Sequence, residues 1–139
     1  MKHIGRIIAV TALGLALAGC APGVPSTEPD IRGVVTDVSG AGGETVSMRV
    51  VWTDDAAAGA QAAYDAAQVT ANADTEWFSR AADGSTAAAE ASEVAVGTVV
   101  EAWFTGAVAE SYPVQATAKT IVIVGAYDGE LPEPPGLAP

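Results

Sequence analysis

The chain is 139 residues long and carries 17 acidic residues, 6 basic residues, one histidine and one cysteine. Its formal net charge of −11 disfavours binding to nucleic-acid phosphates and to anionic lipid headgroups, because both are themselves negative. A single cysteine leaves no partner for an intrachain disulfide, so packing alone must stabilise the folded state.

Residues 1–19 have the three parts of a secretory signal peptide. Lys2 and Arg6 form a short positive region, residues 7–18 are mostly apolar, and small residues follow. The apolar stretch is shorter than the roughly 20 residues that cross a bilayer as a helix, so it does not predict a permanent transmembrane anchor. The sequence therefore predicts export and removal of this segment.

The signal ends in Leu17-Ala18-Gly19-Cys20, which resembles the lipobox of bacterial lipoproteins. The resemblance implies a diacylglyceryl group on the Cys20 sulfur and cleavage between Gly19 and Cys20. Two acyl chains give a stable anchor where one chain binds only marginally. We therefore expect a lipid-anchored protein on the extracytoplasmic face of the cell membrane; the alternative is a secreted precursor in which Cys20 is incidental.

Cleavage after Gly19 leaves 139 − 19 = 120 residues and removes His3, the only histidine. It also removes Lys2 and Arg6, so the mature charge becomes 4 − 17 = −13. With the Cys20 sulfur bound to lipid, Cys–His and Ser–His–Asp catalysis and His/Cys zinc sites are excluded. We expect no catalytic residue, no metal site and no cofactor, and we expect the protein not to be an enzyme.

The mature chain divides into three parts by composition. Residues 20–30 are rich in proline and predict a lipidated N-terminus followed by a tether. Residues 31–125 form one small domain, and residues 126–139 form an acidic, proline-rich tail that we expect to be flexible.

Strand signals dominate the domain. Apolar and other residues alternate in Thr45–Trp52, and a glycine-rich turn at residues 39–43 precedes it. The expected strands are Ile31–Val38, Thr45–Trp52, Gln68–Ala71, Thr75–Phe78, Thr98–Phe104 and Thr117–Val124.

Two alanine-rich stretches interrupt this pattern. Gly59 breaks the first, residues 54–67, whereas the second predicts a short helix capped at Ser85 or Thr86 and ending before Gly97. Together the elements predict an all-β fold, a small OB-like, partly closed barrel of five to six strands with one short helix.

The domain resembles the YobA-like family of small bacterial lipoproteins, whose domain has no known function. The resemblance covers residues 31–124 and rests on the Glu-Ser-Tyr-Pro-x-Gln-Ala-x-Ala motif within residues 109–118, with Gly33, Val35 and residues 94–97 as weaker elements. It implies an OB-like barrel and brings no reaction, cofactor or catalytic residue.

The motif also contains the sharpest candidate surface. Pro113 cannot donate to a β-ladder and favours an extended Tyr112, so the segment should cross from one strand to the next. Glu110, Ser111, Tyr112 and Gln115 would then present polar and aromatic groups for recognition. Alternatively, Tyr112 packs beneath the crossing while Ser111 and Gln115 satisfy backbone groups.

Trp103 is the second candidate. It shares a strand face with Glu101, and an exposed tryptophan is a common binding anchor. Burial beneath a covering loop or beneath the tail is the alternative.

These features favour a non-catalytic binding or interaction module at the cell envelope, with an envelope protein as partner and no nucleic acid. A module that binds a small ligand or a cation through acidic loops is the alternative, and a carboxylate-dependent hydrolase is a weaker one. No calcium-loop signature is present, and the sequence does not indicate an oligomeric state.

Overall fold

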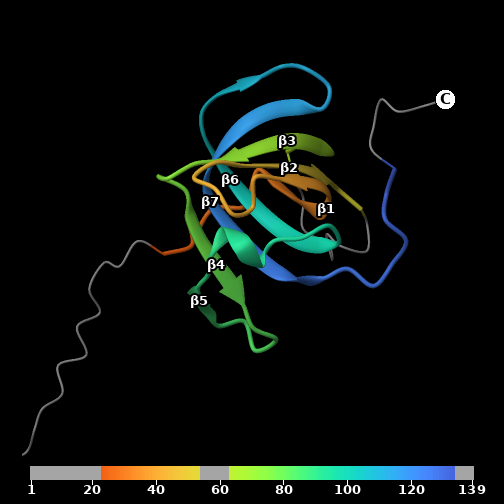
Figure 1. Cartoon of the computed structure of the whole chain (residues 1–139). Coiled ribbons are helices and arrows are strands. Elements are labelled where there is room, and N and C mark those ends of the chain that lie inside the picture. The colour runs from red at the N-terminus through yellow and green to blue at the C-terminus, as the bar shows by residue number, and fades with distance from the viewer. Residues whose placement is uncertain (1–22, 54–62, 134–139) are drawn as a thin grey trace, which may run out of the picture.

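The computed structural model describes residues 23–53 and 63–133 (Figure 1). The predicted signal peptide and Cys20 lie outside these residues, as does most of the first alanine-rich stretch. The strands are β1 (Ile31–Ser39), β2 (Val46–Val51), β3 (Ala66–Ala71), β4 (Glu76–Arg80), β5 (Thr86–Ala88), β6 (Thr98–Ala109) and β7 (Val114–Ala126), and a 3-10 turn, η1, covers Ala91–Glu93. Within the described ranges, no helix has the length and apolar character needed to cross a membrane.

Five of the strands close into a barrel in the order β1–β2–β3–β7–β6, with β6 pairing back to β1. Neighbours in this ring are antiparallel except β3 and β7, which run parallel. Strands β4 and β5 extend the sheet beyond β7 (Figure 1). The predicted small all-β barrel is thus confirmed, and it is fully closed.

Alternation along the strands fills the barrel. Val46, Met48 and Val50 of β2 are fully or almost fully buried, whereas the intervening Ser47 and Arg49 point outward and are partly exposed. The core continues with Val69, Val100 and other aliphatic residues from the remaining strands of the ring. Such apolar burial supplies about 25 cal/mol per Å² and is the main stabilising contribution in a chain without disulfides.

Strand β1 passes very close to the end of β2 at Gly33. A Cβ atom built on Gly33 would lie 2.3 Å from the backbone oxygen of Val51 and 2.9 Å from the backbone nitrogen of Trp52. Only glycine allows this approach, because the atoms it meets are backbone atoms with no freedom to rotate away.

One edge of strand β7 pairs with two different strands. Its first half pairs with β3 and its second half with β4, both parallel, while its other edge pairs with β6 throughout. An irregularity in the β6–β7 ladder leaves Lys119 between the pairs Phe104–Ala118 and Trp103–Thr120. This extra residue changes the alternation, so Ala118 and Ile121 both belong to the core.

Thr75 fills the interruption between β3 and β4. Its hydroxyl donates to the carbonyl oxygen of Ala118 over 2.7 Å and accepts from the backbone N–H of Asn72 over 2.9 Å. Replacing Thr75 by valine should therefore lower the free energy of unfolding by about 1–3 kcal/mol, since two buried or half-buried backbone groups lose their partner.

Thr120 provides the matched control for this prediction. Its side chain is 1% exposed, and its hydroxyl has no hydrogen-bond partner within residues 23–53 and 63–133. Thr120→Val should leave the free energy of unfolding unchanged or raise it by about 1 kcal/mol, because an unsatisfied buried hydroxyl is removed. Urea denaturation followed by tryptophan fluorescence measures both; equal losses in the two variants would contradict this account.

The predicted helix after Ser85 is wrong. Thr86–Ala88 forms strand β5 paired with β4, and only Ala91–Glu93 turns as a 3-10 helix. Alanine favours helix locally, but the free edge of β4 offers backbone partners and the pairing overrides this propensity. Strand β3 likewise begins at Ala66, two residues before the predicted start.

Both ends of the described chain pack onto the barrel. The carbonyl oxygen of Thr27 accepts a hydrogen bond from the Trp103 indole, and Asp30 binds the backbone of β6 through its N–H and its carboxylate. At the other end, Tyr127 packs on Val34 and Val99. Parts of the expected tether and of the expected tail are therefore held in contact with the domain.

Candidate functional site

An open cavity of about 300 Å³ lies on the outer surface of the barrel, where β2, β3 and the start of β7 meet the β6–β7 loop. Its lining residues are Arg49, Gln68, Ser111, Tyr112, Pro113 and Gln115. We call this cavity the Arg49 pocket.

Three lining residues come from one row across the sheet. Arg49 of β2 pairs in register with Gln68 of β3, which in turn pairs with Gln115 of β7. Their chain neighbours, such as Met48 and Val69, point into the core, so the three polar side chains share the outer face. The floor of the pocket therefore carries one guanidinium and two amide groups on rigid strands.

The β6–β7 loop forms the wall. The Tyr112–Pro113 peptide bond is cis, and the Ser111 hydroxyl donates to the Pro113 carbonyl oxygen over 2.9 Å. The amide nitrogen of Gln115 lies 3.4 Å from the Ser111 hydroxyl oxygen. These contacts tie the loop to the strand that follows it.

Tyr112 stands at the rim with 63% of its surface exposed. Its hydroxyl donates to the Asp65 carboxylate over 3.1 Å, which holds the ring in place. Because this hydrogen bond favours the neutral phenol, it raises the pKa of Tyr112 above its ordinary value.

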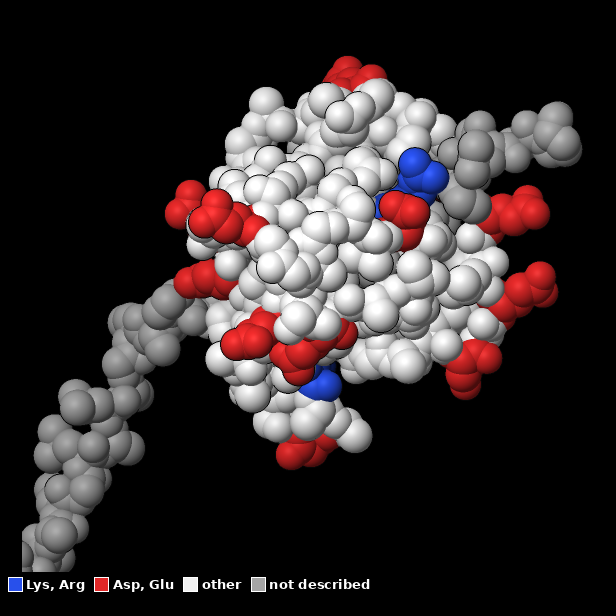
Figure 2. All heavy atoms as spheres, viewed as in Figure 1, with Lys and Arg blue, Asp and Glu red and all other residues white. Residues whose placement is uncertain are grey.

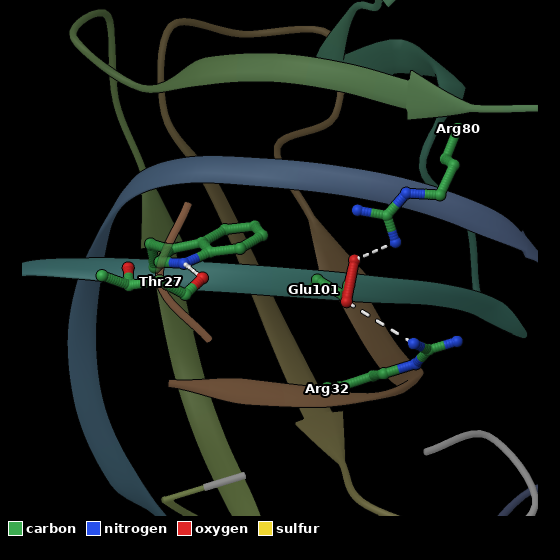
Figure 3. A network of polar contacts seen from close by, with 5 residues as sticks. Thr27, Arg32, Arg80 and Glu101 are labelled. Carbon is green, nitrogen blue, oxygen red and sulfur yellow. Dashed lines mark hydrogen bonds and ion pairs between the residues drawn. The ribbon is translucent and has the colours of Figure 1, made fainter. Parts of the chain in front are cut away.

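Arg49 differs from the two other described arginines. Arg80 and Arg32 both bind the carboxylate of Glu101, which lies between them (Figure 3); the Arg32 Nη1–Glu101 Oε2 distance is 3.5 Å. The Nε atom of Arg49 is shielded from solvent and has no hydrogen-bond partner in the described part of the chain. Arg49 also forms no ion pair with any described carboxylate, so the pocket contains an unpaired guanidinium on an acidic surface with few basic side chains (Figure 2).

The structure brings three of the five candidate surface residues together. Ser111, Tyr112 and Gln115 line the pocket, and Tyr112 is exposed rather than packed beneath the crossing. Glu110 is exposed beside Ser111 but does not line the cavity. Trp103 has to be corrected: it is 6% exposed and covered by the segment around Thr27, so it forms no binding surface.

Sequence reasoning missed Arg49 and Gln68. Both occupy outward positions of strands, where a polar residue is the ordinary occupant. The available signal was the absence of a carboxylate near Arg49 in the alternating strand, but its proximity to Gln115 depends on the β3–β7 pairing. That parallel pairing joins segments more than 40 residues apart and has no local signature.

The acidic loops do not converge where the structure describes them. In residues 23–53 and 63–133, no group of three or more histidine, cysteine, aspartate or glutamate residues is arranged to hold a metal ion. Asp54 and Asp55 lie outside these ranges.

A family model described as "Protein of unknown function (DUF3221)" matches residues 49–125, more than half of the chain. The matched segment begins at Arg49 and includes every residue that lines the pocket. Comparison with curated proteins and comparison with solved structures each gave no match. On the evidence of the family match, the chain belongs to the DUF3221 family, a family of unknown function.

Proposed function

We propose that this protein is a non-catalytic binding module of the YobA-like type, anchored to the cell envelope through lipid on Cys20, and that its ligand occupies the Arg49 pocket. The lipobox resemblance of residues 17–20 supports the anchor. The main observation in favour of binding is the pocket itself, which is lined by an exposed tyrosine and by an arginine that forms no ion pair with any described residue.

The position of the pocket supports recognition. OB barrels bind oligosaccharides and oligonucleotides on the face of their second and third strands and through two adjoining loops. The Arg49 pocket lies on β2 and β3 and includes the loop between the last two strands of the ring. Fold alone does not assign a ligand, so the side chains of the pocket must identify it.

The chemistry of the pocket favours binding over catalysis. Its hydroxyl groups belong to Ser111, which donates to a backbone carbonyl, and Tyr112, whose pKa is raised. A serine nucleophile requires a base that accepts its proton, and a tyrosine nucleophile or base requires a lowered pKa. Neither condition is met, whereas positioned donors and an aromatic rim are what a binding site needs.

In-cell photo-crosslinking tests the proposal. A benzophenone amino acid placed at Tyr112 in the lipidated protein should yield an envelope adduct. The same probe at Val96, which is 49% exposed and does not line the pocket, should yield none. Membrane fractionation of the same cells should find the protein in the membrane pool and should find Cys20→Ala released from it.

The two experiments test separate parts of the proposal. An unchanged membrane pool for Cys20→Ala would overturn the anchor. Equal adducts from positions 112 and 96, or none from position 112, would overturn binding at the pocket. A protein adduct would identify an envelope protein as the partner, and a carbohydrate adduct would identify a small saccharide ligand.

A further inference from the structure

We propose that the Arg49 pocket binds an acidic sugar unit, a single saccharide residue carrying one anionic group that Arg49 recognises. This inference rests on the proposed function, because it names the ligand class of the same site.

The anionic group follows from Arg49. A guanidinium offers five N–H donors in a planar fork that matches carboxylate and phosphate oxygens. Its Nε is solvent-shielded and unpartnered in the described part of the chain, and the register partner of Arg49 on β1, Asp37, is exposed and forms no ion pair with it. Arg49 forms no ion pair with any described residue, so a bound anion would pair with its guanidinium where that group borders the cavity.

Restriction to one anionic group follows from the surroundings. Asp37 precedes Arg49 in the row across the sheet, Asp65 holds Tyr112, and Glu110 adjoins Ser111. A polyanion such as a nucleic acid would bring further negative groups against these carboxylates. A ligand with one acidic group pairs with Arg49 and avoids them.

The amide groups add a requirement that a bare anion does not meet. Gln68 uses its amide nitrogen to donate to Ser47 over 2.7 Å, and the Gln115 amide nitrogen approaches Ser111. Each amide also carries a carbonyl oxygen that needs a donor, and each retains a second N–H. Sugar hydroxyl groups both donate and accept, so they complement this floor, whereas a carboxylate or phosphate alone supplies mainly acceptors.

Tyr112 supplies an apolar surface for the sugar ring. Its ring is exposed at the rim and its hydroxyl donates to Asp65, so it presents an apolar face beside polar groups. The C–H face of a pyranose ring can pack against such a surface while its hydroxyl groups bond to the floor. The volume of about 300 Å³ stands at the lower end of the range for ligand pockets and suits one saccharide unit.

Calorimetric titration of the full-length protein in detergent tests the inference with matched sugar pairs. N-acetylmuramic acid and N-acetylglucosamine differ by a lactyl carboxylate, and glucose 6-phosphate and glucose differ by a phosphate. In at least one pair, the acid should bind at least tenfold more tightly than its neutral partner. The pair that shows the difference tells whether the anion is a carboxylate or a phosphate, and acetate should bind far more weakly than either acidic sugar.

Variants test whether Arg49 causes the difference in affinity between acidic and neutral sugars. Arg49→Gln should reduce the acid-to-neutral ratio to less than twofold, Arg49→Lys should restore part of it, and Tyr112→Ala should weaken both members of a pair. Lys119→Gln removes an exposed charge that does not line the pocket and should leave the ratio unchanged. Circular dichroism checks that each variant is folded, and Arg49 N–H resonances report contact directly if Arg49→Gln fails to fold.

Equal affinity for acidic and neutral sugars, or no binding of any of the four sugars, would overturn the inference. A position-112 adduct in cells together with no sugar binding would leave the proposed function standing with a different ligand class. Loss of both results would overturn the two proposals together.

Discussion

Gly33→Ala is expected to lower the free energy of unfolding by about 3 kcal/mol or more. The added Cβ would stand 2.3 Å from the Val51 carbonyl oxygen, far inside van der Waals contact. The atoms it meets belong to the backbone, so β1 and β2 must separate. Their separation breaks the ring of strands at the β1–β2 seam. Urea denaturation, with circular dichroism as the signal, measures the loss.

Gly42→Ala is the matched control. An added Cβ at Gly42 has nothing within 4 Å, and the substitution should change the free energy of unfolding by less than about 0.5 kcal/mol. If Gly33→Ala proved as mild as Gly42→Ala, the close approach of β1 to β2 would not exist in solution.

Removal of the Glu101 carboxylate is expected to have the second large effect. The Glu101 side chain is 6% exposed and binds both Arg32 and Arg80, whose side chains are 18% and 28% exposed (Figure 3). Without it, two guanidinium groups remain near one another and lose a shared partner. Glu101→Ala should lower the free energy of unfolding by about 3 kcal/mol, the lower end for a buried ion pair because the arginines reach solvent.

Two further variants separate charge from volume. Glu101→Gln keeps the side-chain volume and should still cost about 2 kcal/mol, since only the charge and one acceptor are lost. Glu44→Gln removes an exposed carboxylate in the β1–β2 turn and should stay within about 0.5 kcal/mol of the wild type. A Glu101→Gln variant as stable as wild type would show that the triad contributes packing alone.

The strands that fold by alternation could be predicted from the sequence. Thr45–Trp52 contains β2, and the pattern of apolar residues gave its inward face correctly. The prediction of a helix after Ser85 was wrong because intrinsic helix propensity is weak, and the segment pairs with the free edge of β4 instead. The pairing of one edge of β7 with both β3 and β4 could not be predicted either, because it joins segments that lie far apart in the sequence.

For the candidate site, the sequence predicted only the residues that lie close together along the chain. Ser111 and Tyr112 belong to one proline-containing loop, and Gln115 lies at the start of the strand that follows it, so the local sequence motif pointed to all three. Arg49 and Gln68 join them only through barrel closure, which brings β2, β3 and β7 side by side. The sequence left exposure and burial of Trp103 as alternatives, because the contact that decides for burial comes from Thr27, far away in sequence.

The hydrogen bond between Thr27 and Trp103 also limits how far the barrel can lie from the membrane. Cys20 and Thr27 are 27 − 20 = 7 residues apart, a span of at most about 25 Å in an extended chain. With Cys20 lipidated as proposed, the point where the chain joins the barrel stays within that distance of the bilayer surface. The short tether therefore keeps the pocket in the layer next to the membrane. There the effective concentration of the pocket toward membrane-bound ligands stays high, because the protein cannot diffuse away into the medium.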